Sequence, residues 1–278
     1  MTLRAYLYAL GAIALWSTLA WLSVELAKVP PFLLLGTALL IGATPGLANI
    51  RRWRVPLPTL ALGVFGLFGF HLLLFLALRL APPVEANLVN YLWPLLIVLL
   101  SPLLLRESHL TRSQIGAGLL GCIGAGILIA GNIDPSAPRN LVGFAFALGS
   151  ALTWAVYSLL TKRVAPFSSA AVGGFCVVSG VLAIACHALF EPGHVFQSRE
   201  IWLLIAIGIG PMGAAFYLWD AAIKEGDPRI IGTLAYLTPL LSTGLLLVAG
   251  YGEWTVRFGV AAVMIVGAAV WAGRTERD

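Results

Sequence analysis

The sequence predicts an all-α integral membrane protein with ten transmembrane helices, arranged as two inverted five-helix repeats around a central cavity. Three observations predict this fold: the composition, a series of long apolar runs, and an internal repeat. Of the 278 residues, 60% are hydrophobic and only 10% are charged, and the mean hydropathy is +0.94. These values lie far from those of a soluble domain. The chain is therefore expected to lie in a lipid bilayer.

A helix that crosses a membrane needs roughly 20 predominantly apolar residues. The sequence contains ten such runs, joined by short polar segments: 5–24, 32–48, 57–78, 84–105, 114–131, 141–160, 170–189, 201–223, 230–250 and 256–273. The first run carries no small-residue cleavage site and is followed by nine comparable runs. It is therefore expected to remain as the first helix and not to be removed as a signal peptide.

The positively charged residues predict the orientation of these runs. With the N-terminus inside, the cytoplasmic segments hold twelve of the 17 Lys and Arg residues, and Arg51, Arg52 and Arg54 make the largest single contribution. Short cytoplasmic loops of membrane proteins carry such an excess, so both termini are expected to be cytoplasmic. The cations are scattered over the joints, so no nucleic-acid partner is expected.

The repeat is clearest in the fourth and ninth runs. Residues 87–94 read Asn-Leu-Val-Asn-Tyr-Leu-Trp-Pro, and residues 232–239 end in the same Tyr-Leu-x-Pro pattern 145 positions later. Gly63 and Gly208 are paired at the same offset, as are Pro83 and Pro228. Five spans per repeat place the two halves in opposite orientations, which is typical of secondary transporters.

These boundaries divide the chain into four parts. The prediction is a first repeat over residues 1–132, a linker over 133–140, a second repeat over 141–274 and a C-terminal tail over 275–278.

Over essentially all of its length the chain resembles the drug/metabolite transporter superfamily, whose members carry two EamA-type repeats. Residues 90–94, Asn-Tyr-Leu-Trp-Pro, and the ten-helix layout are similar to the YddG-type aromatic amino acid exporters of bacterial inner membranes. The resemblance implies a basket of helices around a cavity lined mainly by helices one, three, four, six, eight and nine. It also implies export of amino acids or similar metabolites. The expected partners are this small-molecule substrate and the bilayer, and the protein is expected to act as a monomer.

Polar and aromatic residues at mid-depth are the candidates for the substrate site. Hydrocarbon offers an amide no partner, so Asn87 and Asn90 should face either protein or a water-filled cavity. Trp154, Tyr157 and Ser158 form one helical stripe, and for any single ring the alternative is an interfacial belt. The predicted substrate-binding residues are Trp16, Ser17, His71, Asn87, Asn90, Tyr91, Trp93, Trp154, Tyr157, Ser158, Tyr217 and Tyr236.

Ionisable residues within the spans are few. His71 is either a structural histidine bonded to a neighbouring helix or a contact for substrate or proton, and it is expected to share one helix face with Phe68 and Phe75. Glu25 and Arg79, at outer helix ends, are expected to be solvated. Without a mid-span carboxylate or buried cation, the site suits neither a lipophilic cation nor a sugar phosphate. An aromatic cavity with amides and hydroxyls suits a neutral or zwitterionic solute, such as an aromatic amino acid.

Pro94 and Pro239 are either hinges or tolerated kinks in symmetry-related helices. We predict that each helix bends at or just before its proline, so that one face of the cavity closes as the other opens. No catalytic residue, metal site or cofactor is predicted, because the four histidines lie on separate segments and neither HExxH nor GxSxG occurs. The alternatives are a multidrug or other neutral-metabolite exporter of the same superfamily and, with much less support, an intramembrane enzyme.

Overall fold

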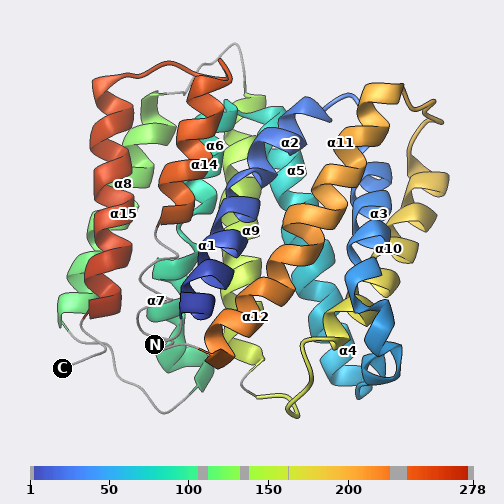
Figure 1. Cartoon of the computed structure of the whole chain (residues 1–278). Coiled ribbons are helices and arrows are strands. Elements are labelled where there is room, and N and C mark those ends of the chain that lie inside the picture. The colour runs from blue at the N-terminus through green and yellow to red at the C-terminus, as the bar shows by residue number, and fades with distance from the viewer. Residues whose placement is uncertain (1–2, 106–111, 132–137, 162, 226–236, 275–278) are drawn as a thin grey trace.

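The computed structural model describes residues 3–105, 112–131, 138–161, 163–225 and 237–274. Within these ranges every regular element is helical, and most of the helices run along one common direction (Figure 1). The first half of the chain forms α1 (Leu3–Ser17), α2 (Leu19–Glu25), α3 (Pro31–Gly42), η1 (Thr44–Trp53), α4 (Leu57–Val64), η2 (Phe65–Gly69), α5 (Phe70–Leu80), α6 (Pro83–Asn90), α7 (Trp93–Leu105) and α8 (Arg112–Gly131). The second half forms α9 (Arg139–Leu160), α10 (Ala171–Phe190), α11 (Ser198–Ile209), η3 (Gly210–Ala214), α12 (Ala215–Glu225), α14 (Leu237–Val248) and α15 (Val256–Arg274).

The length and composition of the helices make this a multi-pass membrane protein. Five helical stretches are long and apolar enough to cross a bilayer: Leu3–Glu25, Leu57–Leu80, Arg139–Leu160, Ala171–Phe190 and Ser198–Trp219. A sixth is added if the bent pair of α3 and η1 counts as one span. The remaining predicted spans are shorter described helices or include undescribed residues, so the total of ten stays a prediction. In Figure 1, α1 begins and α15 ends at the same end of the bundle.

The predicted fourth span is not one continuous helix. α6 ends at Asn90 and α7 begins at Trp93. Between them, the Leu92 amide donates to the Val89 carbonyl at 3.1 Å, three residues back, which tightens the last turn. Pro94 has no N–H to donate to the carbonyl of Asn90, four residues earlier, and this explains an interruption directly before the proline. In the ninth run α14 begins at Leu237, and Tyr236 lies outside the described residues.

Two π-helical turns occur at matching places in the two halves. η2 separates α4 from α5, and η3 separates α11 from α12. Their first residues, Phe65 and Gly210, are 145 positions apart, which is the offset of the sequence repeat. A π turn places one extra residue in the helix, so the residues on either side do not keep the register of a continuous α-helix.

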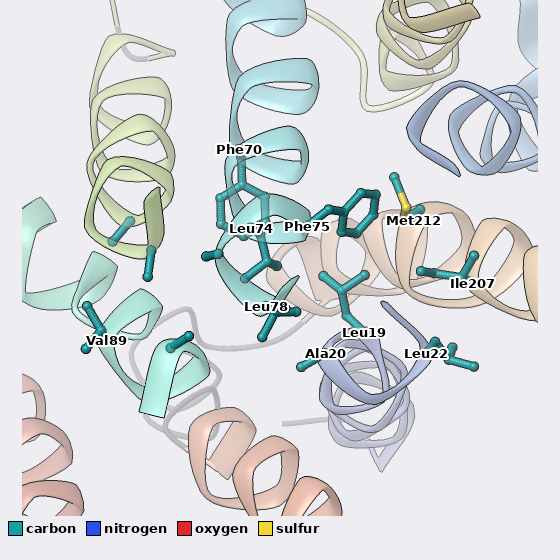
Figure 2. Packing of buried hydrophobic residues seen from close by; sticks show 14 of the residues in the cluster. Leu19, Ala20, Leu22, Phe70, Leu74, Phe75, Leu78, Val89, Ile207 and Met212 are labelled. Atoms are coloured by element: carbon teal, nitrogen blue, oxygen red, sulfur yellow. The ribbon is translucent and has the colours of Figure 1, made fainter. Parts of the chain in front are cut away.

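The buried core joins both halves of the chain. Figure 2 shows Phe75 of α5 and Met212 of η3 lying close to Leu19 of α2. Phe75 is 1% exposed and Met212 is completely buried. Within a bilayer such contacts stabilise the bundle through close packing, because the lipid tails are as apolar as the side chains.

The end of the bundle opposite α1's first residue carries a polar network, and Glu25 is not solvated as expected. The Tyr251 hydroxyl donates to Glu25 Oε1 at 2.7 Å, and Arg199 Nη2 pairs with Glu25 Oε2. Only 13% of the Glu25 side chain is exposed. The hydrogen bond to Glu25 and partial burial raise the pKa of Tyr251. These bonds join the end of α2 to the start of α11 and to the segment before α15.

Arg79 is not solvated either. Its Nη2 donates to the carbonyl oxygen of Val29 at 2.5 Å and to that of Leu26 at 3.4 Å, so the guanidinium satisfies carbonyls that follow α2. At the start of α3, the Glu191 carboxylate accepts hydrogen bonds from free backbone amides. Its Oε1 accepts a hydrogen bond from the Phe32 amide at 2.9 Å. Sequence position at a helix end did not reveal either role, because the partners lie on other segments of the chain.

Candidate functional site

Aromatic rings from four helices meet in the interior of the bundle, and Trp154 of α9 is their centre. Its ring centroid lies 5.0 Å from that of Phe70 in α5, 5.3 Å from that of Tyr157 and 6.2 Å from that of Phe216 in α12. Phe216 in turn lies 5.8 Å from Trp16 of α1. We call Trp16, Phe70, Trp154, Tyr157 and Phe216 the aromatic cluster.

The cluster brings together predicted residues that are far apart in the sequence. Trp16, Trp154 and Tyr157 were all candidates, and each retains part of its surface accessible to solvent. Phe70 and Phe216 were not among the predicted binding residues. Phe70 directly follows η2 and Phe216 lies two residues after η3. Their usable signal in the sequence was an aromatic residue next to a predicted site residue, His71 and Tyr217 respectively. The arrangement offers ring faces and edges on which a planar apolar group can stack.

Asn87 holds two helices together. Its Nδ2 donates to Ser242 Oγ at 3.1 Å and lies 3.3 Å from Thr243 Oγ1, so that α6 is bonded to α14. Asn87 is 2% exposed, and Ser242 is completely buried. Of the two environments expected for this amide, the structure shows protein. Ser242 and Thr243 were missed, although two adjacent hydroxyls within an apolar run, just after Pro239, were a usable signal.

Asn90 has a different environment. Its side chain is 3% exposed, and its Oδ1 atom has no hydrogen-bond partner in the described part of the chain. A buried acceptor without a partner is costly, and it marks a position where a donor from a ligand or water is favoured. Tyr91, at the interruption of the helix, is 8% exposed and faces Ser242. Trp93 is partly buried and packs against the hydrophobic core.

The hydroxyls of Ser17 and Ser158 donate to carbonyls of their own helices. Ser17 Oγ lies 2.7 Å from the Ile13 carbonyl oxygen, and Ser158 Oγ lies 2.7 Å from that of Trp154. Their protons are therefore used within the helix, and only the oxygen lone pairs remain for a ligand.

His71 is 1% exposed and bonded to its own helix. Its Nδ1 lies 2.7 Å from the Leu67 carbonyl oxygen, so Nδ1 carries the proton. The ring contacts Phe70 at 4.9 Å and Phe75 at 6.2 Å. Phe68 does not share this face as predicted. It lies within η2 and stacks on Phe32 of α3 at 6.1 Å, because the π turn changes the register between Phe68 and His71.

Tyr217 reaches η1. Its hydroxyl oxygen lies against Gly46, and this buried hydroxyl has no hydrogen-bond partner within the described ranges. Tyr217 thus contacts the segment at the end of the bundle where α1 begins. The structure brings Trp16, Trp154 and Tyr157 into the aromatic cluster and sets His71 against Phe70 of that cluster. It joins Asn87 and Tyr91 to α14 and sets Tyr217 against η1.

Comparison with known proteins agrees with a transporter fold. The sequence model of the EamA-like transporter family matches residues 3–130 and 141–274. A protein named aromatic amino acid exporter YddG, from Ancylobacter novellus, is 41% identical and covers 96% of each chain. Proteins of the same name from Salmonella typhimurium and Escherichia coli are 28% and 26% identical. They cover 94% and 95% of this chain and 94% of their own lengths. A solved crystal structure with 41% identity superimposes with a TM-score of 0.75 and covers 98% of this chain and 97% of the other.

Proposed function

Because the chain belongs to the EamA-like transporter family, we propose that it exports amino acids, aromatic ones above all, across the bacterial inner membrane. The observation that carries this proposal is the aromatic cluster, in which rings of α1, α5, α9 and α12 meet around Trp154. An indole or phenyl side chain stacks between such rings, and each aromatic pair is worth roughly 0.5–1.5 kcal/mol beyond its buried area. The name of the 41% identical relative supports the same substrate class.

Asn90 supplies the polar part of the proposed site. Its Oδ1 is buried without a partner, and its main-chain carbonyl lacks the donor that Pro94 cannot provide. The ammonium of an amino acid carries three donors and is attracted to the carbonyl end of a helix, which here is the end of α6. The interrupted helix therefore suits the amino group while the aromatic cluster suits the side chain.

The mechanism that we propose is alternating access between two halves of opposite orientation. The proposal includes ten spans, both termini in the cytoplasm and a monomer as the working unit. Repeats in opposite orientations allow one face of a central site to open while the other closes. The interruption before Pro94 is the element that we assign to this motion in the first half, and Pro239 is its counterpart in the second.

A flux measurement tests the proposal. Purified protein is placed in liposomes, and the release of labelled tryptophan, threonine and a cationic dye is compared with and without a proton gradient. Release of tryptophan faster than that of threonine and of the dye is expected. Equal rates for all three, or preference for the dye, would contradict an amino acid exporter, and the response to the gradient identifies the coupling.

A further inference from the structure

The segment η1 is not parallel to the helices of the bundle. It follows α3 at a bend of 75°, so it lies across the end of the bundle and not along it. Leu47 and Ile50 are 53% and 54% exposed, and the exposed Arg51, Arg52 and Arg54 follow directly. The backbone of Asn49 is not helical, so Leu47 and Ile50 lie on either side of a kink in η1. Exposed apolar residues beside a row of cations are typical of a segment that lies in the membrane–water interface.

The three arginines have no carboxylate partner in the described structure. None of Arg51, Arg52 and Arg54 takes part in a salt bridge between described residues. Three uncompensated guanidinium groups at a bilayer surface attract anionic headgroups, and the interaction is felt within a Debye length of that surface.

A half-open surface cavity of about 470 Å³ lies at the same place, lined by Ile50, Arg51 and Arg54. Guanidinium groups bind phosphate oxygens through paired N–H donors, and Ile50 supplies an apolar wall. A ligand that carries both a phosphate and an apolar portion fits this combination.

η1 is also held firmly by the second half of the chain. The Trp53 indole lies so close to Gly173 of α10 that a Cβ there would be 2.6 Å from it. Tyr217 of α12 lies against Gly46. The cationic segment is therefore fixed to α10 and α12, and an occupant of the cavity would stabilise the contact between the two halves.

We propose that η1 and Arg54 form a binding site for an anionic phospholipid, with Arg51 and Arg54 on the headgroup phosphate and Ile50 and Leu47 beside the acyl region. Charge complementarity selects an anionic headgroup. The exposed apolar residues select a lipid over free phosphate, because a soluble anion would leave them without a partner. This site is separate from the aromatic cluster and does not depend on which solute is carried.

Thermal unfolding in a neutral detergent tests the site. Phosphatidylglycerol, phosphatidylcholine with the same acyl chains, and inorganic phosphate are added separately at constant ionic strength. Phosphatidylglycerol is expected to raise the Tm of the parent by several degrees, and the other two are expected to leave it unchanged. The double variant Arg51→Gln/Arg54→Gln should lose this shift. The matched control Arg112→Gln/Arg163→Gln, which removes two exposed cations at the start of α8 and just after α9, should keep it.

Three results would overturn the proposal. The first is an equal shift with phosphatidylcholine, the second is the same shift with inorganic phosphate alone, and the third is a full shift in Arg51→Gln/Arg54→Gln. If that double variant does not fold, the single variant Arg54→Gln tests the site. Arg54 is exposed and lies outside η1, so its replacement should not disturb the fold. Its shift should be clearly smaller than that of the parent, and an undiminished shift would reject the site.

Discussion

Gly36 of α3 and Gly180 of α10 touch each other in a reciprocal contact. A Cβ on Gly36 would lie 2.7 Å from the Ile184 side chain and 3.0 Å from the Gly180 carbonyl oxygen. A Cβ on Gly180 would lie 2.8 Å from the Leu40 side chain and 3.1 Å from the Gly36 carbonyl oxygen. Residue pairs that contact each other in both directions are what a two-fold axis produces. The predicted inverted repeat requires such an axis, and the contact of α3 with α10 is what it would produce.

Gly42 provides a sharp test of this packing. A Cβ at this position would collide with the Met212 carbonyl oxygen in η3, which is backbone and cannot turn aside. We expect Gly42→Ala to lower the stability by about 1–3 kcal/mol, as overpacking does. The measurement is the Tm in detergent. Gly259→Ala is the control, because nothing lies within 4 Å of a Cβ there. Equal Tm values for the two variants would show that α3 does not pack on η3 in this way.

Substitutions in the aromatic cluster should affect transport more than folding. Trp154→Ala removes the ring that contacts Phe70, Tyr157 and Phe216, and we expect the transport rate for tryptophan to fall roughly tenfold or more. Tyr91→Ala is expected to lower transport as well. Trp254, which is 74% exposed, provides the control, and Trp254→Ala should leave the transport rate almost unchanged. If all three behave alike, or if the first two only abolish expression, the rings are structural.

Substitutions of Asn87 and Asn90 should differ in their effects on stability and on transport. Asn87→Leu leaves the buried hydroxyls of Ser242 and Thr243 without their donor and should cost about 1 kcal/mol of stability. Asn90→Leu removes an acceptor that has no partner, so it should lower the Tm less, yet reduce amino acid transport more. This expectation is tested by measuring the Tm and the initial transport rate of both variants. The reverse order would remove Asn90 from the proposed site.

Fusions to alkaline phosphatase test the orientation that the arginine distribution predicts. Fusions after Lys28, Pro138 and Gly193 are expected to be active, because these positions should lie outside the cytoplasm. Fusions after Arg54 and Arg163 should be silent. The opposite pattern would reject cytoplasmic termini together with the inverted arrangement.

The prolines should act on opposite faces of the substrate site. Pro94→Ala restores an N–H and is expected to close the interruption between α6 and α7, which biases the protein toward one facing state. Pro239→Ala should bias it toward the other. A shift of one to two kcal/mol changes the ratio of states roughly tenfold. A cysteine at Ser17, in a background without Cys122, Cys176 and Cys186, reports the change through labelling by an impermeant thiol reagent. Equal labelling in both variants and the parent would mean that the prolines are tolerated kinks.

The sequence predicted those features that depend on local pattern. Long apolar runs identified a membrane protein, and helical spacing placed Trp154 and Tyr157 on one stripe, where their rings lie 5.3 Å apart. The π turns at Phe65–Gly69 and Gly210–Ala214 recur at the offset of 145 positions that the sequence shows, but the sequence predicted a π turn at neither place.

Features that depend on partners from other helices could not be predicted in this way. A 3.6-residue period assigns Phe68 to the face of His71, and the period does not hold across a π turn. The sequence left open whether Asn87 faces protein or a cavity, because its partners, Ser242 and Thr243, lie more than 150 positions away. Glu25 and Arg79 were expected in water because the residues that pair with them are distant in the chain.

The matched π turns also bear on the history of the chain. A π turn arises when one residue is added to an α-helix, and η2 and η3 carry that addition at equivalent positions. Two independent insertions at one place are a poorer explanation than a single insertion in an ancestral half-length unit whose gene was later duplicated. On this account the ancestor already had the irregular helix that is now α4, η2 and α5 in the first half and α11, η3 and α12 in the second.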